Sequence, residues 1–397
     1  MNMEYVRLGD ICTKIGSGAT PAGGKEAYKG GDYKLVRSQN VLDLKFSKEG
    51  LAEINDEQAK KLKNVTLCEN DVLLNITGDS VARSCLVPKE ILPARVNQHV
   101  SIIRPQKDIL DSYYLLCYLQ VNKEYLLALA STGSTRNAIT KEMIEKLKIQ
   151  FPPLSTQQKI SSILSTYDTL IENNAKRIRL LEQMAENLYK EWFVRFRFPG
   201  HENAEMENGL PKGWKVEKLF EVADVLMGQS PESKYYNEEK QGLPFHQGVG
   251  SYGDFYLNDS IYSTEGKRIA KPFSIIFSVR APVGRININL NRIILGRGVA
   301  SINHKNGYNA FLLWCLKDKF AKEDSIGNGS IFTSVTKDEL LKQKITIPTR
   351  ELLEQFNSLT SNIEKGIRVL TRKNALLTRQ RDLLLPRLMS GKLEVTI

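Results

Sequence analysis

The sequence predicts an α+β protein: two mixed α/β globular domains separated by two long antiparallel coiled-coil helices, with a pseudo-two-fold internal repeat. Three observations predict this fold. Residues 133–188 match residues 329–384 without a gap, each copy contains a long stretch with a helical apolar stripe, and the remaining segments contain short strand-like runs. We expect globular domains at 1–153 and 199–348, with helical segments at 154–198 and 349–397.

The repeat is the most informative feature of the sequence. Its strongest part has a constant offset of 196 residues, which pairs Gly133 with Gly329, Thr140 with Thr336, Pro152 with Pro348, Ile171 with Ile367 and Leu188 with Leu384. Upstream the matches are shorter and the offset changes: GATP faces GQSP, and VAR at Val81 to Arg83 faces VGR at Val283 to Arg285. The order is therefore domain, helix, domain, helix, with a shared frame and different loop lengths.

Residues 156–193 are predicted to form one helix of roughly 57 Å, and a second helix is predicted from about Glu351 to Leu385, stopping at Pro386. Each has apolar residues three and four positions apart, so each needs a partner for one face. Because a whole domain separates the copies, the second helix can return beside the first in antiparallel orientation. The predicted interface comprises Ile160, Ile163, Tyr167, Leu170, Asn174, Ile178, Leu181, Met184 and Leu188 with Phe356, Leu359, Ile363, Ile367, Leu370, Leu377 and Leu384.

Two alternatives remain open for the helices. Asn174 either fixes the register inside the pair or faces solvent at an irregular point of the stripe. The helices themselves could instead each pack on their own domain.

The globular parts combine several short strands with a few helices. DVLLNITG, HVSIIRP, KPFSIIFSV and GRININL are typical of strands, and SYYLLCYLQ and AFLLWCLKD are typical of short helices.

Composition favours a polyanionic partner and an intracellular location. The formal net charge is +11 at pH 7, which suits nucleic acid. The start, MNMEYVRLGD, carries charges before any apolar run, so no signal peptide is expected. The five cysteines are scattered and odd in number, which favours reduced, partly buried thiols in the cytoplasm.

No motif for chemistry stands out in the sequence. The four histidines lie apart from one another and from the cysteines, so no metal site is expected. GATPAGGKE departs from a phosphate-binding loop, because five residues separate Gly18 from Gly24 and Glu26 replaces the required Ser or Thr. We therefore expect a protein that is not an enzyme. The alternatives are a self-sufficient DNA-modifying enzyme and an unrelated DNA-binding coiled-coil adaptor.

Four sets of residues resemble the specificity subunits of type I restriction-modification systems, over nearly the full chain. They are LPKGWKVEKL followed by GQSP, GDYKLVRSQNV, the pair SVRAPVGRI and LGRGVASI, and the central helix from PPLSTQQKISSIL to LLEQMAENLYKEWF. The first half has only the weaker opening EYVRLGDI followed by GATP.

The resemblance implies two target recognition domains, each reading one half of a split, asymmetric sequence in double-stranded DNA. It implies two methyltransferase (M) subunits and restriction (R) subunits as partners. S-adenosylmethionine, ATP and Mg²⁺ would then belong to those partners, with no cofactor in this chain.

Reading bases needs polar side chains in the major groove, and anchoring on phosphates needs Lys and Arg. The predicted DNA contacts of the first domain are Arg37, Gln39, Asn75, Arg83, Asn97, Gln98, His99, Ser134, Arg136 and Asn137. Those of the second domain are Gln229, Tyr235, Tyr236, His246, Gln247, Arg280, Arg285, Arg297, Asn328 and Ser330. Asn75, Asn97 and Gln98 could equally be turn formers or buried amides.

The helix ends offer a second surface. Tyr189, Trp192 and Phe193, together with Arg387 on the second helix, are predicted to dock a partner subunit. Packing of these side chains on the chain's own domains is the alternative.

Overall fold

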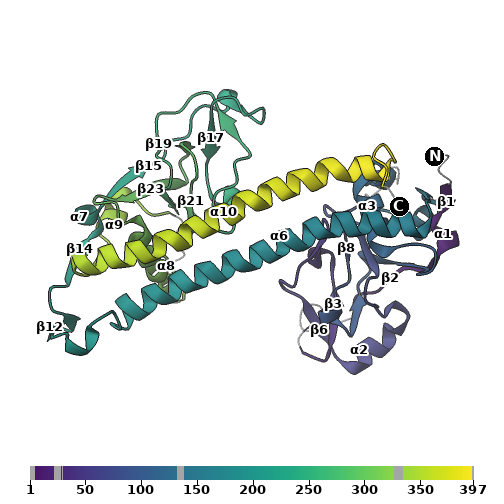
Figure 1. The fold of residues 1–397 in the computed structure, drawn as a ribbon, viewed down its shortest axis with the longest axis horizontal. Helices are drawn as coiled ribbons and strands as arrows, with labels where there is room; N and C mark the ends of the chain where they lie inside the picture. The colour runs from purple at the N-terminus through teal and green to yellow at the C-terminus, as the bar shows by residue number, and fades with distance from the viewer. Residues whose placement is uncertain (1–4, 22–27, 29, 132–137, 326–333, 396–397) are drawn as a thin grey trace. The chain divides into compact units, whose positions relative to one another are not determined.

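The computed structural model describes residues 5–21, 28, 30–131, 138–325 and 334–395, with the backbone alone for 321–325 (Figure 1). The chain divides into two compact units: unit 1 comprises Met1–Asn174 and Arg372–Ile397, and unit 2 comprises Ala175–Thr371. The two long helices are α6 (Leu154–Tyr189) and α10 (Arg350–Met389), and each contributes one half to each unit.

Unit 1 is built on a four-stranded antiparallel sheet with the order β2 (Cys12–Ser17), β10 (Val100–Pro105), β7 (Val72–Asn75) and β8 (Ser84–Leu86). A second sheet has the order β6 (Ala52–Ile54), β3 (Tyr33–Val36) and β9 (Ala94–Val96), with β3 and β9 parallel. Two short pairs, β1 (Tyr5–Arg7) with β11 (Lys148–Gln150) and β4 (Val41–Leu42) with β5 (Lys45–Phe46), complete the strands. The helices of unit 1 are α1 (Leu8–Ile11), α2 (Asp56–Lys61), α3 (Ser112–Val121), α4 (Lys123–Ser131) and α5 (Lys141–Lys146).

Unit 2 repeats this plan. Its four-stranded antiparallel sheet has the order β15 (Ala223–Met227), β23 (Val299–His304), β20 (Ile275–Ser278) and β21 (Ile286–Ile288). Its second sheet has five strands, β16 (Tyr236–Asn237), β18 (Tyr262–Ser263), β17 (Leu243–His246), β22 (Ile293–Leu295) and β19 (Ile269–Ala270), with β17 and β22 parallel. Its short strand pairs are β14 (Lys215–Lys218) with β24 (Lys344–Ile347) and β12 (Met206–Glu207) with β13 (Leu210–Pro211). Its helices are α7 (Leu219–Val222), α8 (Asn309–Ser325) and α9 (Lys337–Leu341).

The predicted repeat is confirmed down to single hydrogen bonds. Thr140 and Thr336 cap α5 and α9 in the same way, each accepting a hydrogen bond from the amide three residues on. The VAR and VGR segments form the same turn, in which Ala82 and Gly284 have φ of 66° and 85°. The Ala82 amide donates to the Asn75 carbonyl, as the Gly284 amide does to Ser278.

The long helices have the predicted positions with one correction at an end. Pro386 does not stop α10, which continues to Met389. A proline in the last turn forfeits one backbone hydrogen bond. The three further residues place Leu388 and Met389, each 3% exposed, in the core of unit 1.

Within unit 1, α6 and α10 run antiparallel. The Asn174 side-chain amide donates to Asn374 Oδ1 over 2.8 Å, and the Asn374 amide donates to the Ile171 carbonyl over 3.1 Å. Further along, Arg381 Nη1 lies 2.6 Å from Asp168 Oδ1. Asn174 therefore lies inside the pair, where a polar pair fixes the register, and the solvent-facing alternative is wrong.

Within unit 2 the other halves of the helices pair in the same sense. A Cβ added at Gly366 of α10 would lie 3.3 Å from Leu181 Cδ1 of α6. The rings of Tyr189 and Phe356 meet with centroids 6.3 Å apart. Positions later in α6 thus face positions earlier in α10, as the predicted antiparallel arrangement requires.

The predicted apolar stripe is only partly buried. Ile163, Leu170, Met184 and Leu359 are 36–59% exposed, which contradicts their prediction as buried interface residues. Leu164 and Ala185 are buried instead, at 0% and 1%. The difference arises because each helix half packs on its own sheet as well as on the other helix, so the core of each unit decides which face is covered.

None of the helices in the described residues combines the length and the apolarity needed to cross a bilayer.

Candidate nucleic-acid interface

Four segments of unit 1 meet at one edge, at the ends of β2, β3 and β7 and in the loop between β9 and β10. The Gly18 amide donates to the Asn97 carbonyl, and the Asn97 amide donates to the Val36 carbonyl, over 3.1 and 3.0 Å. The Ile76 amide donates to the His99 carbonyl over 3.0 Å, and Thr77 forms a bridge with Ala138. Predicted contacts that are far apart in sequence are therefore brought together here.

A chain of side-chain hydrogen bonds crosses this edge. Thr77 Oγ1 lies 2.6 Å from His99 Nδ1, and Gln98 Nε2 lies 3.1 Å from His99 Nε2. The Thr20 hydroxyl donates to Gln98 Oε1. Gln98 and Thr20 are exposed and His99 is half-buried, so the hydrogen-bond chain reaches the surface at Gln98 and Thr20.

Asn75 and Asn97 lie at the same edge but beneath its surface. They are 0% and 5% exposed. The side-chain amide of Asn75 donates to the Ser38 carbonyl over 2.9 Å. Asn97 Oδ1 accepts a hydrogen bond from the backbone N–H of His99 over 3.1 Å. This burial contradicts the prediction that they contact DNA, and they act instead as buried amides that hold the loops.

The other described candidates of unit 1 reach the surface. Gln39 is exposed, and its side chain donates to the Gly50 carbonyl over 3.2 Å, as does Arg37 Nη2 over 2.6 Å. Arg83 is half-buried beside Asn75. The backbone N–H of Asn75 donates to the backbone carbonyl of Arg83 over 2.8 Å.

Unit 2 has the same edge with different side chains. The Gly228 amide donates to the Val299 carbonyl and the Gln229 amide to the Leu295 carbonyl, over 3.0 and 2.8 Å. Arg280 forms a bridge with Ser334, the counterpart of Thr77 with Ala138. Gln229, Arg280 and Arg297 are all exposed on this edge.

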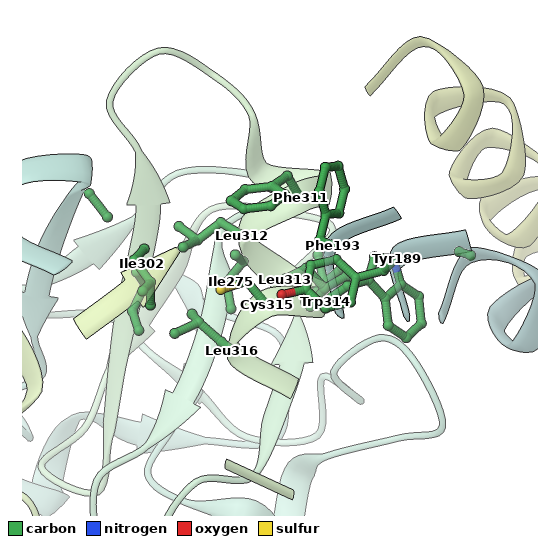
Figure 2. Packing of buried hydrophobic residues seen from close by; sticks show 14 of the residues in the cluster. Tyr189, Phe193, Ile275, Ile302, Phe311, Leu312, Leu313, Trp314, Cys315 and Leu316 are labelled. Atoms are coloured by element: carbon green, nitrogen blue, oxygen red, sulfur yellow. The ribbon is translucent and has the colours of Figure 1, made fainter. Parts of the chain in front are cut away.

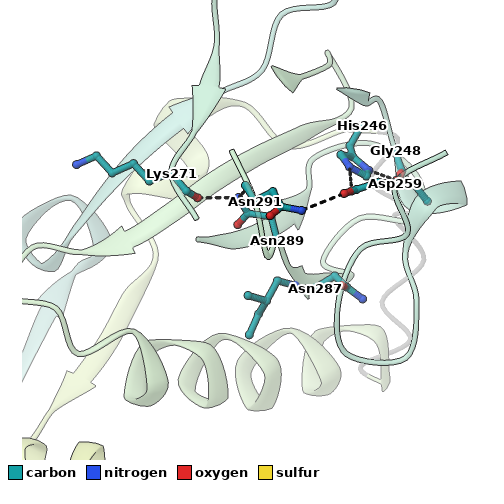
Figure 3. A network of polar contacts seen from close by, with 9 residues as sticks. His246, Gly248, Asp259, Lys271, Asn287, Asn289 and Asn291 are labelled. Carbon is teal, nitrogen blue, oxygen red and sulfur yellow. Dashed lines mark hydrogen bonds and ion pairs between the residues drawn. The ribbon is translucent and has the colours of Figure 1, made fainter. Parts of the chain in front are cut away.

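His246 contradicts its prediction as a DNA contact, because its side chain is 1% exposed. Nδ1 lies 2.8 Å from Ser251 Oγ, and Nε2 lies 3.0 Å from Asp259 Oδ1 (Figure 3). Asn291 donates to the other oxygen of Asp259 over 3.4 Å. His246 therefore ties the loop at 248–259 to the second sheet.

Of the aromatic candidates of unit 2, Tyr236 borders a groove of about 490 Å³, which is also lined by Phe245 and Gln247. The Tyr236 ring stacks on Phe245 with centroids 4.6 Å apart, and its hydroxyl donates to the Pro231 carbonyl over 2.9 Å. Tyr235 lies under the Lys234 ammonium, which is 4.9 Å from the ring centroid. Gln247 is exposed.

Five candidates, Ser134, Arg136, Asn137, Asn328 and Ser330, lie outside the described residues. Arg285 is exposed but lines a cavity of about 800 Å³ with α6 and α8.

The predicted docking aromatics are part of the core of unit 2. Tyr189, Trp192 and Phe193 are 6–7% exposed. Phe193 packs against Phe311 with ring centroids 5.0 Å apart (Figure 2). Its ring centroid is also 5.0 Å from that of Phe356. This contradicts the prediction that they form a docking surface and favours the alternative, packing on the chain's own domain. Arg387 is exposed and stays a predicted docking residue.

Sequence reasoning missed two half-buried glutamates in unit 2, Glu182 on α6 and Glu364 on α10. Burial raises the pKa of each to about 7. Glu182 Oε1 has no hydrogen-bond partner, and nearby Lys317 partly offsets the shift of the Glu182 pKa. No pattern distinguishes these two glutamates from the exposed ones on the same helices.

These carboxyl groups predict a pH dependence of stability. Their folded-state pKa exceeds the unfolded value of about 4.3, so the folded state binds more protons between these values. Their contribution is complete below pH 4 and is lost as the pH rises through 7. We expect the Glu182→Gln, Glu364→Gln double variant to lose less thermal stability between pH 5 and 8.5 than the parent chain, measured by calorimetry.

The matched control is Glu207→Gln, a substitution of an exposed glutamate in unit 2. An equal pH dependence of the melting temperature in the parent and the double variant would contradict the prediction.

Among the described residues, no three His, Cys, Asp or Glu side chains are grouped so that they could hold a metal ion. The five cysteines form no disulfide bonds, and three of them, Cys85, Cys117 and Cys315, are buried. Burial raises the pKa of the Cys85 thiol to about 12, so this thiol is a poor nucleophile.

Comparisons with known proteins agree with this arrangement of domains. The family described as type I restriction modification DNA specificity domain matches residues 1–183 and 211–378. The putative type I restriction enzyme MjaX specificity subunit of Methanocaldococcus jannaschii is 28% identical, over 99% of this chain and 94% of the relative. The HindI specificity subunit of Haemophilus influenzae is 22% identical, over 90% of this chain and 94% of the relative.

A solved structure shares the fold. The type I restriction-modification S subunit from M. genitalium superposes with a TM-score of 0.60 at 15% identity, over 98% of this chain and 96% of that one. With two family domains that cover most of its length, the chain belongs to the type I restriction-modification DNA specificity subunits.

Proposed function

We propose that the chain reads a bipartite, asymmetric sequence in double-stranded DNA and directs adenine methylation and restriction by partner subunits. In this proposal residues 1–153 and 199–348 are the two target recognition domains, and 154–198 and 349–397 are the spacer helices.

The observation that carries the proposal is the repeated edge. Both units present the same strand ends and the same loop, yet Thr77 corresponds to Arg280 and Gln98 to Arg297. A symmetric dimer would read two equal half-sites. Two fused domains with one frame and different edge residues can read two unlike half-sites.

Membership in the family supports the partners proposed here. The chain is a specificity subunit and not an enzyme, and the catalytic activities of these systems lie in partner subunits. We propose that two M subunits bind S-adenosylmethionine and transfer the methyl group, and that R subunits use ATP and Mg²⁺. The complex would act in the cytoplasm, where its DNA lies.

The test is to co-express the chain with its M subunit in a host without adenine methylation and to map methylated adenines across the genome. We expect a single motif made of two unlike half-sites with a fixed gap. The M subunit alone and this chain alone are the controls. Methylation by this chain alone, or a motif that does not depend on it, would contradict the proposal.

A further inference from the structure

We propose that Gln98 reads an adenine in one half-site and that Arg297, at the same place in unit 2, reads a guanine in the other. This inference rests on the proposed function and assigns a base to one position of each recognition domain.

The two residues occupy equivalent positions by strand register. Val100 begins β10 opposite Asn75, the last residue of β7, and Val299 begins β23 opposite Ser278, the last residue of β20. Gln98 and Arg297 each stand two residues before that first valine, and both are exposed.

The segment after the first strand of the sheet contacts both residues, through the side chain of Gln98 and through the backbone of Arg297. Thr20 follows β2 and donates through its hydroxyl to the Gln98 side chain. Ser230 follows β15 at the matching place, and its hydroxyl accepts a hydrogen bond from the Arg297 amide over 3.0 Å. GATP and GQSP, which are matched in the repeat, therefore both form hydrogen bonds with this loop.

The hydrogen bonds around His99 link its tautomer to the orientation of the Gln98 amide. The Gln98 Nε2 group can only donate, so His99 Nε2 accepts its hydrogen bond. In the neutral ring the proton is then on Nδ1, which donates to the Thr77 hydroxyl. The orientation of the Gln98 amide and the tautomer of His99 are therefore coupled, and in either orientation the amide keeps its hydrogen bonds to Thr20 and His99.

The held amide keeps the groups that adenine requires. After its bonds to Thr20 and His99, it has one N–H donor and one acceptor position left. Adenine presents an acceptor at N7 and a donor at N6 in the major groove, and glutamine pairs with both. Because the amide is already fixed, less side-chain entropy is lost on binding.

Arg297 meets the corresponding requirement for guanine. A guanidinium donates two parallel hydrogen bonds to guanine O6 and N7. The loop is anchored on both sides of it: a Cβ at Gly298 would lie 2.2 Å from the Gln247 carbonyl oxygen, and a Cβ at Gly296 would lie 2.8 Å from Gln247 Cα. The backbone of the loop thus lies directly against Gln247, the residue after β17, and this contact fixes the backbone from which the arginine side chain extends.

The experiment uses the full chain in complex with its M subunit, with methylated adenines mapped across a genome. For Gln98→Ala we expect one adenine position of one half-site to accept other bases, with its discrimination falling tenfold or more. Gln98→Glu keeps the shape but loses the donor, so we expect the same adenine preference to be lost. Arg297→Ala should relax one guanine position in the other half-site.

The matched control is Gln106→Ala, an exposed glutamine just beyond the far end of β10, which should leave the motif unchanged. A parent complex without a bipartite motif would overturn the proposed function and this inference with it. A bipartite motif that Gln98→Ala and Gln98→Glu leave intact, or weaken equally at all sites, would overturn this inference alone.

Discussion

Inserting four residues after Lys176 in α6, with four at the facing position after Arg372 in α10, should lengthen the gap between the half-sites by about two base pairs. Four residues add roughly 6 Å to a helix, and DNA advances about 34 Å per turn of ten base pairs. Four residues are close to one helical turn, so the apolar faces of both helices stay nearly in phase. The bases read in each half-site should not change.

The measurement is the methylation motif of the complex with the M subunit. The control inserts the same four residues between Lys107 and Asp108, in an exposed turn after β10. We expect this control to keep the parent gap. An unchanged gap in the helix-insertion variant would show that α6 and α10 do not set the spacing.

The architecture could be predicted from the sequence because its signals are periodic or repeated. An offset of 196 residues relates Thr140 to Thr336, and both cap a helix in the structure. The apolar stripe predicted two long helices, and the chain order predicted their antiparallel pairing. What periodicity could not predict is which side each half-helix buries, because that depends on the sheet it meets, as Leu164 and Ile163 show.

The candidate interface was less predictable, because polar residues at strand ends have two roles that look alike in a sequence. Asn97 and Gln98 are neighbours in the β9–β10 loop, yet Asn97 is 5% exposed and Gln98 is exposed. Only the hydrogen bonds of the converging loops distinguish Asn97, whose side chain holds the loops together, from Gln98, whose side chain is exposed. His246 was misassigned for the same reason, since its partner Asp259 lies 13 residues further along the chain, in a loop.

Phe193→Ala should destabilise unit 2 by about 3–5 kcal/mol, the usual cost of removing a buried phenylalanine. The ring is 6% exposed and packs against rings from α8, α10 and the segment before β14: Phe311, Phe356 and Trp214. Truncation to alanine leaves a cavity where these elements meet. Calorimetry of the full chain should show a melting temperature lowered by roughly 10 °C.

The same variant separates a core residue from a docking residue. If Phe193 contacted a partner, Phe193→Ala would keep the parent melting temperature and lose binding of the M subunit. Arg387→Ala is the matched control, because Arg387 is exposed in the last turn of α10 and its truncation should change stability by less than about 0.5 kcal/mol. Phe193 lies in the helical turn that directly follows α6 and packs against α8 and α10, so its loss should also loosen the helix that is proposed to set the gap.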